Sequence, residues 1–367
     1  MKKALGIYIH IPFCVRKCRY CDFLSGPAGQ DVQEKYVEML FHEIESYKEL
    51  LKERVTDTVF FGGGTPSVLE GHQIAKILRK LRKYGNISEH AEISIEANPG
   101  TVYEEKLQIW KQAGINRISF GLQSAENEEL KRLGRIHTWE EFEENFKLAR
   151  KCGFDNLNVD LMSALPGQTV DTWRKTMERV TSLNPEHISA YSLIIEEGTP
   201  FFDAYDNHPE LLPSEEEERR MYYETKAFLA SKGYERYEIS NYAKPGYECR
   251  HNLSYWERID YLGIGLGAAS LLGNVRKSNQ TDLNEYLKGN FAGESEILSP
   301  VNAMEEYFFL GLRKMKGVDW TLYREQYTHV VKKLTAEGVL EIEGNYIRLT
   351  ERGIDVSNYV LAEFLQE

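Results

Sequence analysis

The stretch that decides the fold runs from Leu5 to Cys21 and reads LGIYIHIPFCVRKCRYC. Its first half alternates apolar and polar positions, which predicts a β-strand over Leu5–Ile11. Its second half carries three cysteines in the spacing C-x-x-x-C-x-x-C, directly after that strand. Thiols at the carboxyl end of a strand indicate a site at that edge of the sheet.

The three thiols lie within eight residues of one another, so they converge in space with almost any local backbone. Three interpretations stay open from the spacing. Zinc needs a fourth ligand, for which the candidates are His10, Cys249 and His251. A redox pair of Cys18 and Cys21 leaves Cys14 without a role. An iron–sulfur cube held by three thiolates leaves one iron open for another ligand.

Short β-rich runs recur along the first half of the chain. They cover Leu5–Ile11, Thr58–Phe61, Glu92–Ala97, Arg117–Leu122, Asn158–Met162 and Ile188–Ile194. Longer segments with helical spacing lie between them, which predicts parallel βαβ units. The repeat length of about 25–50 residues favours an open or closed α/β barrel over a solenoid.

Glycines and polar side chains follow the ends of these strands. Gly62–Pro66 follows the second strand, and Glu96 lies near the end of the third. Gln123 and Arg135 follow the fourth strand, and Asp160 lies in the fifth. Turn formation explains the glycines, but it explains the charged and amide side chains poorly. Because barrel folds place their sites at the carboxyl ends of the strands, we expect these residues to line one site.

The pattern changes from about Leu211 onward. Tyr234–Tyr242 is predicted to be a strand, and Val339–Thr350 to be a β-hairpin. Helices followed by a hairpin predict a small, winged-helix-like α+β module at the C-terminus. The expected domains are a barrel core, a barrel extension and this module, at residues 1–210, 211–299 and 300–367.

Composition excludes several classes of protein. The 367 residues carry 45 Lys+Arg and 57 Asp+Glu, a formal charge of −12, which argues against affinity that rests on the phosphates of nucleic acid or lipid. The C-terminal module is therefore expected to act in docking or as a lid. No run of about 18 apolar residues occurs, so no membrane-spanning helix is expected. Five cysteines form no disulfide framework and favour a reducing, cytoplasmic location.

Several motifs together resemble the radical S-adenosylmethionine (SAM) superfamily. They are Tyr8-x-His10-Ile11-Pro12-Phe13-Cys14 through Cys21, Gly62–Pro66 and Glu96-Ala97-Asn98-Pro99. More narrowly, the combination resembles the family of oxygen-independent coproporphyrinogen III oxidase and its relative HemW, a haem chaperone, over essentially the whole chain. The resemblance implies an α/β fold: a partial (β/α)6 radical-SAM barrel that precedes the small C-terminal module.

The resemblance also implies cofactors. Cys14, Cys18 and Cys21 would ligate a [4Fe–4S] cluster whose open iron chelates SAM, and the cluster would donate the electron that cleaves SAM to a 5′-deoxyadenosyl radical. The expected SAM-contacting positions are Tyr8, Tyr20, Gly63, Gly64, Thr65, Glu96, Gln123, Arg135 and Asp160. Among them, Gln123, Arg135 and Asp160 match positions that contact a second SAM in the oxidase. The glycines would let the backbone approach the cofactor, since a Cβ would obstruct it.

Two departures separate the chain from the oxidase. The oxidase has a fourth cysteine where this chain has Phe23, and it has an N-terminal extension, whereas here Tyr8 nearly begins the chain. The segment from His251 to Trp256 instead matches the H-N-x-x-Y-W motif associated with HemW. A histidine in a polar stretch is by default a surface or hydrogen-bonded residue, but the motif makes His251 the expected haem ligand, with Cys249 as the alternative.

Three functions are weighed. The leading one is a haem chaperone that binds haem and transfers it to an acceptor hemoprotein, for which a respiratory enzyme is one candidate; a homodimer is compatible with this role. The alternative is an oxygen-independent coproporphyrinogen III oxidase, which converts propionates to vinyls, although the departures above predict that this activity is absent. A radical-SAM enzyme acting on RNA ranks third, because such an enzyme is expected to carry a basic appended domain.

Overall fold

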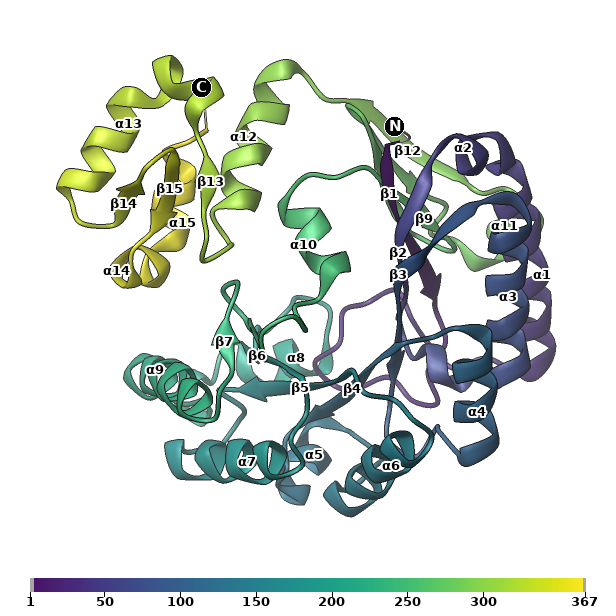
Figure 1. Ribbon diagram of the computed structural model, residues 1–367. Helices are drawn as coiled ribbons and strands as arrows, with labels where there is room; N and C mark the ends of the chain where they lie inside the picture. The colour runs from purple at the N-terminus through teal and green to yellow at the C-terminus, as the bar shows by residue number, and fades with distance from the viewer. Residues whose placement is uncertain (1–2, 366–367) are drawn as a thin grey trace.

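The computed structural model describes residues 3–365. A 12-stranded sheet curves into a partial barrel with helices on its outer side, and a separate three-stranded sheet lies in a module at the C-terminus (Figure 1). The predicted α/β class and the partial barrel are therefore confirmed.

Parallel strands form the barrel wall in chain order. They are β1 (Ala4–Ile11), β2 (Val55–Gly63), β3 (Asn86–Ala97), β4 (Arg117–Gln123), β5 (Leu157–Ser163) and β6 (His187–Ser192). Each predicted strand overlaps one of these, so the prediction of parallel βαβ units is confirmed. The connecting helices are α1 (Gln30–Ser46), α2 (Lys48–Glu53), η1 (Pro66–Val68), α3 (Gly71–Tyr84), α4 (Glu104–Ala113), α5 (Asn127–Leu133), α6 (Trp139–Lys151) and α7 (Val170–Ser182).

Alternation along these strands separates two environments. Ile7, Ile118 and Val159 belong to the apolar core that the strands share with the helices. The neighbouring positions point to the other face, since successive side chains of a strand alternate, and there Ser119 and Asn158 line a cavity inside the barrel. The barrel therefore has an apolar outer layer and a polar interior.

The second half of the chain extends the sheet at both ends. Next to β1 lie β9 (Tyr261–Ile264), β10 (Ala269–Leu272), β11 (Val275–Asn279) and β12 (Ala292–Ile297), and next to β6 lie β8 (Asn241–Ala243) and β7 (Glu235–Arg236). The helices here are α8 (Pro200–Tyr205), η2 (Pro209–Leu211), α9 (Glu215–Ser231), α10 (Arg250–Trp256) and α11 (Leu283–Tyr286).

The prediction of a single strand over Tyr234–Tyr242 is wrong. The segment forms β7 and β8, which pair with each other antiparallel. The chain reverses between them because the Glu238 carboxylate accepts hydrogen bonds from the Ser240 N–H at 2.8 Å and from the Asn241 side chain at 2.6 Å. Both bonds are local, and they stabilise a turn in place of a straight strand.

Helix α10 lies on the inner side of the curved sheet, whereas most other barrel helices lie outside (Figure 1). The Glu92 carboxylate on β3 accepts hydrogen bonds from the backbone N–H groups of Arg250 at 2.9 Å and His251 at 3.1 Å, which fixes the start of the helix. The His251 ring stacks on Phe60 of β2 with 5.1 Å between ring centroids. The helix therefore fills part of the barrel interior.

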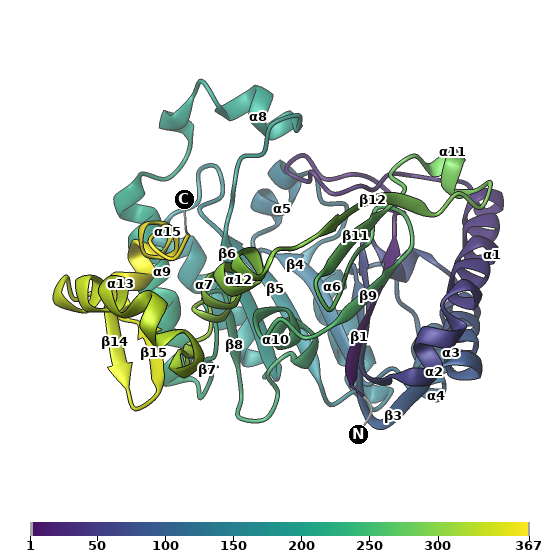
Figure 2. The same ribbon diagram turned by 90° about the horizontal axis from the view of Figure 1, so that it is seen from above.

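The C-terminal module has its own hydrophobic core around Phe308, Val331 and Ile347. Its elements are α12 (Pro300–Gly311), β13 (Val318–Asp319), η3 (Thr321–Tyr323), α13 (Arg324–Ala336), β14 (Leu340–Glu343), β15 (Tyr346–Leu349), α14 (Glu351–Asp355) and α15 (Ser357–Ala362). The strands β14 and β15 form the hairpin predicted over Val339–Thr350. The module lies to one side of the barrel, next to α9 and β7 (Figure 2).

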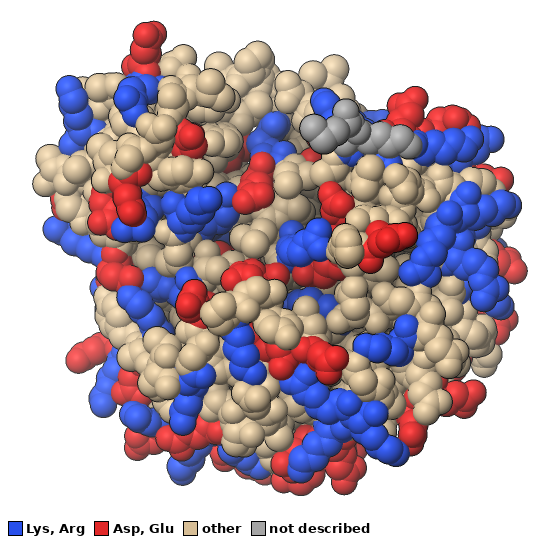
Figure 3. All heavy atoms as spheres, viewed as in Figure 1, with Lys and Arg blue, Asp and Glu red and all other residues tan. Residues whose placement is uncertain are grey.

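Two further features concern the length and hydropathy of the helices and the distribution of charge on the surface. Within residues 3–365, no helix is both long enough and apolar enough to cross a membrane. On the face shown in Figure 3, basic and acidic side chains are interspersed.

A buried carboxylate ties α1 to the sheet extension. Glu43 is fully buried and accepts hydrogen bonds from the Gly265 N–H at 2.9 Å, the Tyr286 hydroxyl at 2.6 Å and the Asn279 amide at 2.5 Å. Burial raises the pKa of Glu43 from 4.5 to about 7, although these hydrogen bonds act in the opposite direction.

This pKa predicts a pH-dependent stability. A carboxyl whose pKa is raised by folding contributes its full stabilisation below pH 4.5 and loses it as the pH rises to about 7. Over that range, wild type should lose up to about 3 kcal/mol of unfolding free energy relative to Glu43→Gln. Urea unfolding across this pH range measures the difference. Glu38→Gln, at an exposed position of the same helix, should follow wild type; parallel pH profiles of Glu43→Gln and wild type would contradict the assignment.

Candidate functional site

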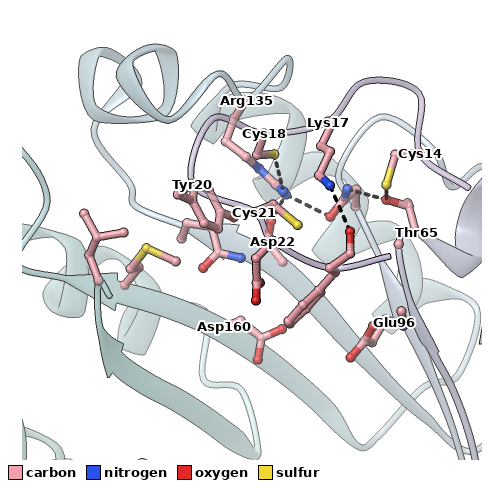
Figure 4. A pocket seen from close by; sticks show the side chains of 18 of the residues that line it. Cys14, Lys17, Cys18, Tyr20, Cys21, Asp22, Thr65, Glu96, Arg135 and Asp160 are labelled. Carbon is pink, nitrogen blue, oxygen red and sulfur yellow. Dashed lines mark hydrogen bonds between the residues drawn. The ribbon is translucent and has the colours of Figure 1, made fainter. Parts of the chain in front are cut away.

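A pocket of about 290 Å³ lies at the carboxyl ends of the barrel strands (Figure 4). It brings together nearly all the residues that the sequence placed in one site. Its lining includes Cys14, Cys18, Tyr20, Cys21, Gly63, Gly64, Thr65, Glu96, Gln123, Arg135 and Asp160.

Two loops meet at the base of this pocket, one after β1 and one after β2. The Gly64 N–H donates to the Ile11 carbonyl at 2.9 Å, and the Thr65 N–H donates to the Phe13 carbonyl at 2.8 Å. A Cβ on Gly64 would lie 2.7 Å from the Phe13 carbonyl oxygen and 3.0 Å from the Cys14 sulfur. Glycine is therefore required here by the contact between the two loops themselves.

Polar side chains link two of the cysteines. The Thr65 hydroxyl lies 3.5 Å from the Cys14 sulfur and accepts a hydrogen bond from the Asn98 amide at 3.0 Å. The Asn98 side-chain oxygen accepts from Arg135 at 2.8 Å, and Arg135 also lies 3.5 Å from the Cys18 sulfur. Sequence reasoning gave Asn98 no role of its own, although its place directly after β3 was a signal.

Two partly buried carboxyl groups form the lower wall of the pocket (Figure 4). Glu96 accepts a hydrogen bond from the Gly63 N–H at 3.1 Å, and burial together with the charge of Asp160 raises the pKa of Glu96 to about 8. Asp160 accepts from Ser119 at 3.0 Å and from Asn158 at 2.7 Å, and burial raises its pKa as well. At neutral pH, Glu96 therefore holds a proton that it can donate to a ligand.

Gln123 lies in the pocket wall with a positive φ of 74°, a backbone conformation that residues other than glycine adopt at an energetic cost. The Tyr191 hydroxyl donates to its side-chain oxygen at 2.9 Å and holds the amide in place. Tyr191 was missed from the sequence, because it lies in the middle of the predicted strand Ile188–Ile194, whereas the observed strand β6 ends at Ser192. Such backbone strain is concentrated at functional sites of proteins.

The three thiols surround the pocket without converging on one point. Within residues 3–365, no three His, Cys, Asp or Glu side chains are arranged to hold a metal ion. Of the two histidines proposed as a fourth zinc ligand, His10 is engaged with Tyr8 and the Leu24 carbonyl, each at 3.0 Å. Cys249 is buried beside Glu92, 3.5 Å away. Three thiols that line one pocket supply the ligands that an iron–sulfur cube with one open iron needs.

Two of the predicted site residues lie elsewhere. Tyr8 and His251 line a second cavity of about 230 Å³, deeper in the barrel. His251 is 1% exposed, and its ring nitrogens lie 2.8 Å from the Thr58 hydroxyl and 3.0 Å from the Tyr255 hydroxyl. Burial, assisted by the charge of Arg117, lowers the pKa of His251 to about 3, so the ring is neutral.

Comparison with known proteins agrees with this geometry. Residues 8–180 match the radical SAM superfamily, and residues 298–356 match the HemN C-terminal domain. The chain is 35% identical to "Heme chaperone HemW" of Lactococcus lactis subsp. lactis (strain IL1403), covering 100% of this chain and 98% of that protein. It is also 35% identical to the protein of that name in Escherichia coli (strain K12), covering 99% and 98%.

Among solved structures, coproporphyrinogen III oxidase (HemN) from Escherichia coli is similar over 99% of this chain and 90% of that one, with a TM-score of 0.86 and 25% identity. These matches run across the barrel, its extension and the C-terminal module. The chain therefore belongs to the radical SAM superfamily and, within it, to the HemW family.

Proposed function

We propose that this protein is a haem chaperone that binds haem and transfers it to an acceptor hemoprotein. The observation that carries the proposal is the 35% identity to proteins named heme chaperone HemW over the whole length of the chain. The absence of a cysteine at position 23, where Phe23 is 60% exposed at the pocket, supports this role over that of the oxidase.

We also propose that Cys14, Cys18 and Cys21 hold a [4Fe–4S] cluster, with SAM beside it. The pocket supports this because all three thiols line it, together with Gly63, Gly64 and Thr65. When bound, the cluster supplies the electron for reductive cleavage of SAM. The role of the barrel is to hold both groups in register and to keep water from them.

The residues around the thiols are proposed to bind SAM. Protonated Glu96 donates a hydrogen bond, while Asp160 and Gln123 accept from ammonium and hydroxyl groups of the ligand. Arg135 faces Cys18 and adds positive charge at the cluster end. Tyr20, Gly63 and Thr65 complete the wall of the pocket. Tyr8 lies one layer deeper, where it acts by orienting His10.

His251 is proposed as the haem ligand on one condition. Both of its ring nitrogens have hydrogen-bond partners, so iron can bind only after the bond to Thr58 or Tyr255 breaks. Haem binding through His251 therefore requires either that the Tyr255 side chain turns aside or that α10 moves away from β2, which carries Thr58. Transfer would take place in the cytoplasm to a hemoprotein such as a respiratory enzyme, by a monomer or a homodimer.

The cysteine assignment predicts a loss of iron. Replacing Cys14, Cys18 or Cys21 with Ala should abolish the brown absorbance and most of the iron of anaerobically reconstituted protein, because each thiolate holds one corner of the cluster. Cys152→Ala is the matched control, since Cys152 lies at the end of α6. Wild-type iron content in any of the three pocket variants would contradict the ligand set.

The haem assignment predicts opposite effects of two substitutions on α10. In an anaerobic haem titration followed by Soret absorbance, wild type should bind stoichiometrically, and His251→Gln should bind at least about tenfold more weakly. Tyr255→Phe should bind at least as tightly as wild type, because it frees one ring nitrogen. Equal binding by His251→Gln and wild type would refute the ligand, and no specific binding by wild type would refute the chaperone.

One observation favours an alternative function. The structure superposes on coproporphyrinogen III oxidase from Escherichia coli with a TM-score of 0.86. If wild type binds no haem, turnover of coproporphyrinogen III with SAM and a reductant is the next assay, and formation of protoporphyrinogen IX would establish the oxidase.

A further inference from the structure

Arg117 on β4 is a buried cation. Its side chain points into the barrel and the residue is 2% exposed. Within residues 3–365, its guanidinium forms neither a hydrogen bond nor an ion pair, and its Nε is fully enclosed without an acceptor. Removing an ion from water without compensation is costly, so such a group indicates an absent partner.

Two carboxylates that act electrostatically on Arg117 are engaged with other groups. Glu92 and Asp160 act electrostatically on Arg117, but neither forms an ion pair with it within 4.0 Å. Glu92 caps the start of α10, and Asp160 is held by Ser119 and Asn158. No residue that the structure describes therefore accepts a hydrogen bond from the guanidinium.

A second unpartnered group faces the same cavity. The side-chain amide of Asn252, on α10, has no hydrogen bond to any residue that the structure describes, and it lines the cavity of about 230 Å³ with Arg117. The walls also include the aromatic rings of Tyr8 and Phe60. The cavity therefore presents a fixed cation, an amide donor and an apolar flank.

We propose that this cavity binds an alkyl carboxylate about the size of propionate. A carboxylate matches the planar fork of a guanidinium and can accept a further bond from the Asn252 amide, while its alkyl part packs against the rings. One negative charge is enough, because Glu92 and Asp160 already lie near Arg117 and disfavour a dianion such as phosphate.

The carboxylate has two sources. It is a free acid, or it is a propionate arm of the haem that His251 is proposed to bind. The second source is open because His251 lines the same cavity as Arg117 and Asn252. Only this second source rests on the proposed haem function.

The test uses the full-length protein and trifluoroacetate as a 19F NMR probe. Its signal should broaden on binding, propionate should restore it, and the neutral isostere propionamide should not. Binding should weaken at least about tenfold in Arg117→Met and measurably in Asn252→Ala. Arg250→Met, which alters an exposed arginine of α10, the helix that carries Asn252, should bind the probe as wild type does. The Asn252→Ala variant keeps the test decisive if Arg117→Met does not fold.

Two results would overturn the proposal. One is the absence of saturable broadening in wild type, which leaves water as the partner of Arg117. The other is that the Arg117→Met and Asn252→Ala variants bind the probe as tightly as wild type does. The source is decided by competition. If haem displaces the probe and haem dimethyl ester does not, the propionate arm occupies the cavity. If neither displaces it, or both do, the arm is excluded and a free carboxylate is the ligand. Haem affinity itself is followed separately by Soret absorbance, so failure of the chaperone function is recognised independently.

Discussion

Two backbone loops approach each other so closely at the mouth of the barrel that one residue at their contact, Gly64, must be glycine. The loop after β2 hydrogen-bonds to Ile11 and Phe13, at the beginning of the cysteine loop, and Gly64 lies where a Cβ would strike the Phe13 carbonyl. This contact is possible because β1 and β2 pair in parallel and end together, with Ile11 opposite Gly63. The positions of Cys14, Thr65 and, through Asn98, Arg135 all follow from it.

The interior of the barrel is the second determinant of function. Its strands present polar side chains inward, and α10 enters from the open side with its first N–H groups held by Glu92. The same helix contacts the C-terminal module, because the Arg313 guanidinium carbon lies 4.5 Å from the centroid of the Trp256 ring. The segment His251–Trp256 therefore joins the cavity inside the barrel to the C-terminal module.

Local patterns predicted the fold well where one residue type repeats with a simple period. The alternation in β1 and the glycines after β2 identified the barrel and its mouth, and the pocket gathers Glu96, Gln123, Arg135 and Asp160 as expected. The prediction of a single strand over Tyr234–Tyr242 failed because the turn there depends on hydrogen bonds that the Glu238 carboxylate accepts. Such bonds leave no periodic pattern in the sequence. The burial of His251 could not be predicted from local sequence either, because it depends on contacts with Thr58 and Phe60, which are distant in the sequence.

The most direct test of the account compares two glycines of the same mouth region. Gly64→Ala places a methyl group against the cysteine loop, whereas a Cβ on Gly26 would meet no atom within 4 Å. After anaerobic reconstitution and reduction, electron paramagnetic resonance is recorded with and without SAM. We expect a cluster signal that shifts with SAM in wild type and Gly26→Ala, and a lost or SAM-insensitive signal in Gly64→Ala. A wild-type response from Gly64→Ala would contradict the claim that the contact between the two loops builds the site.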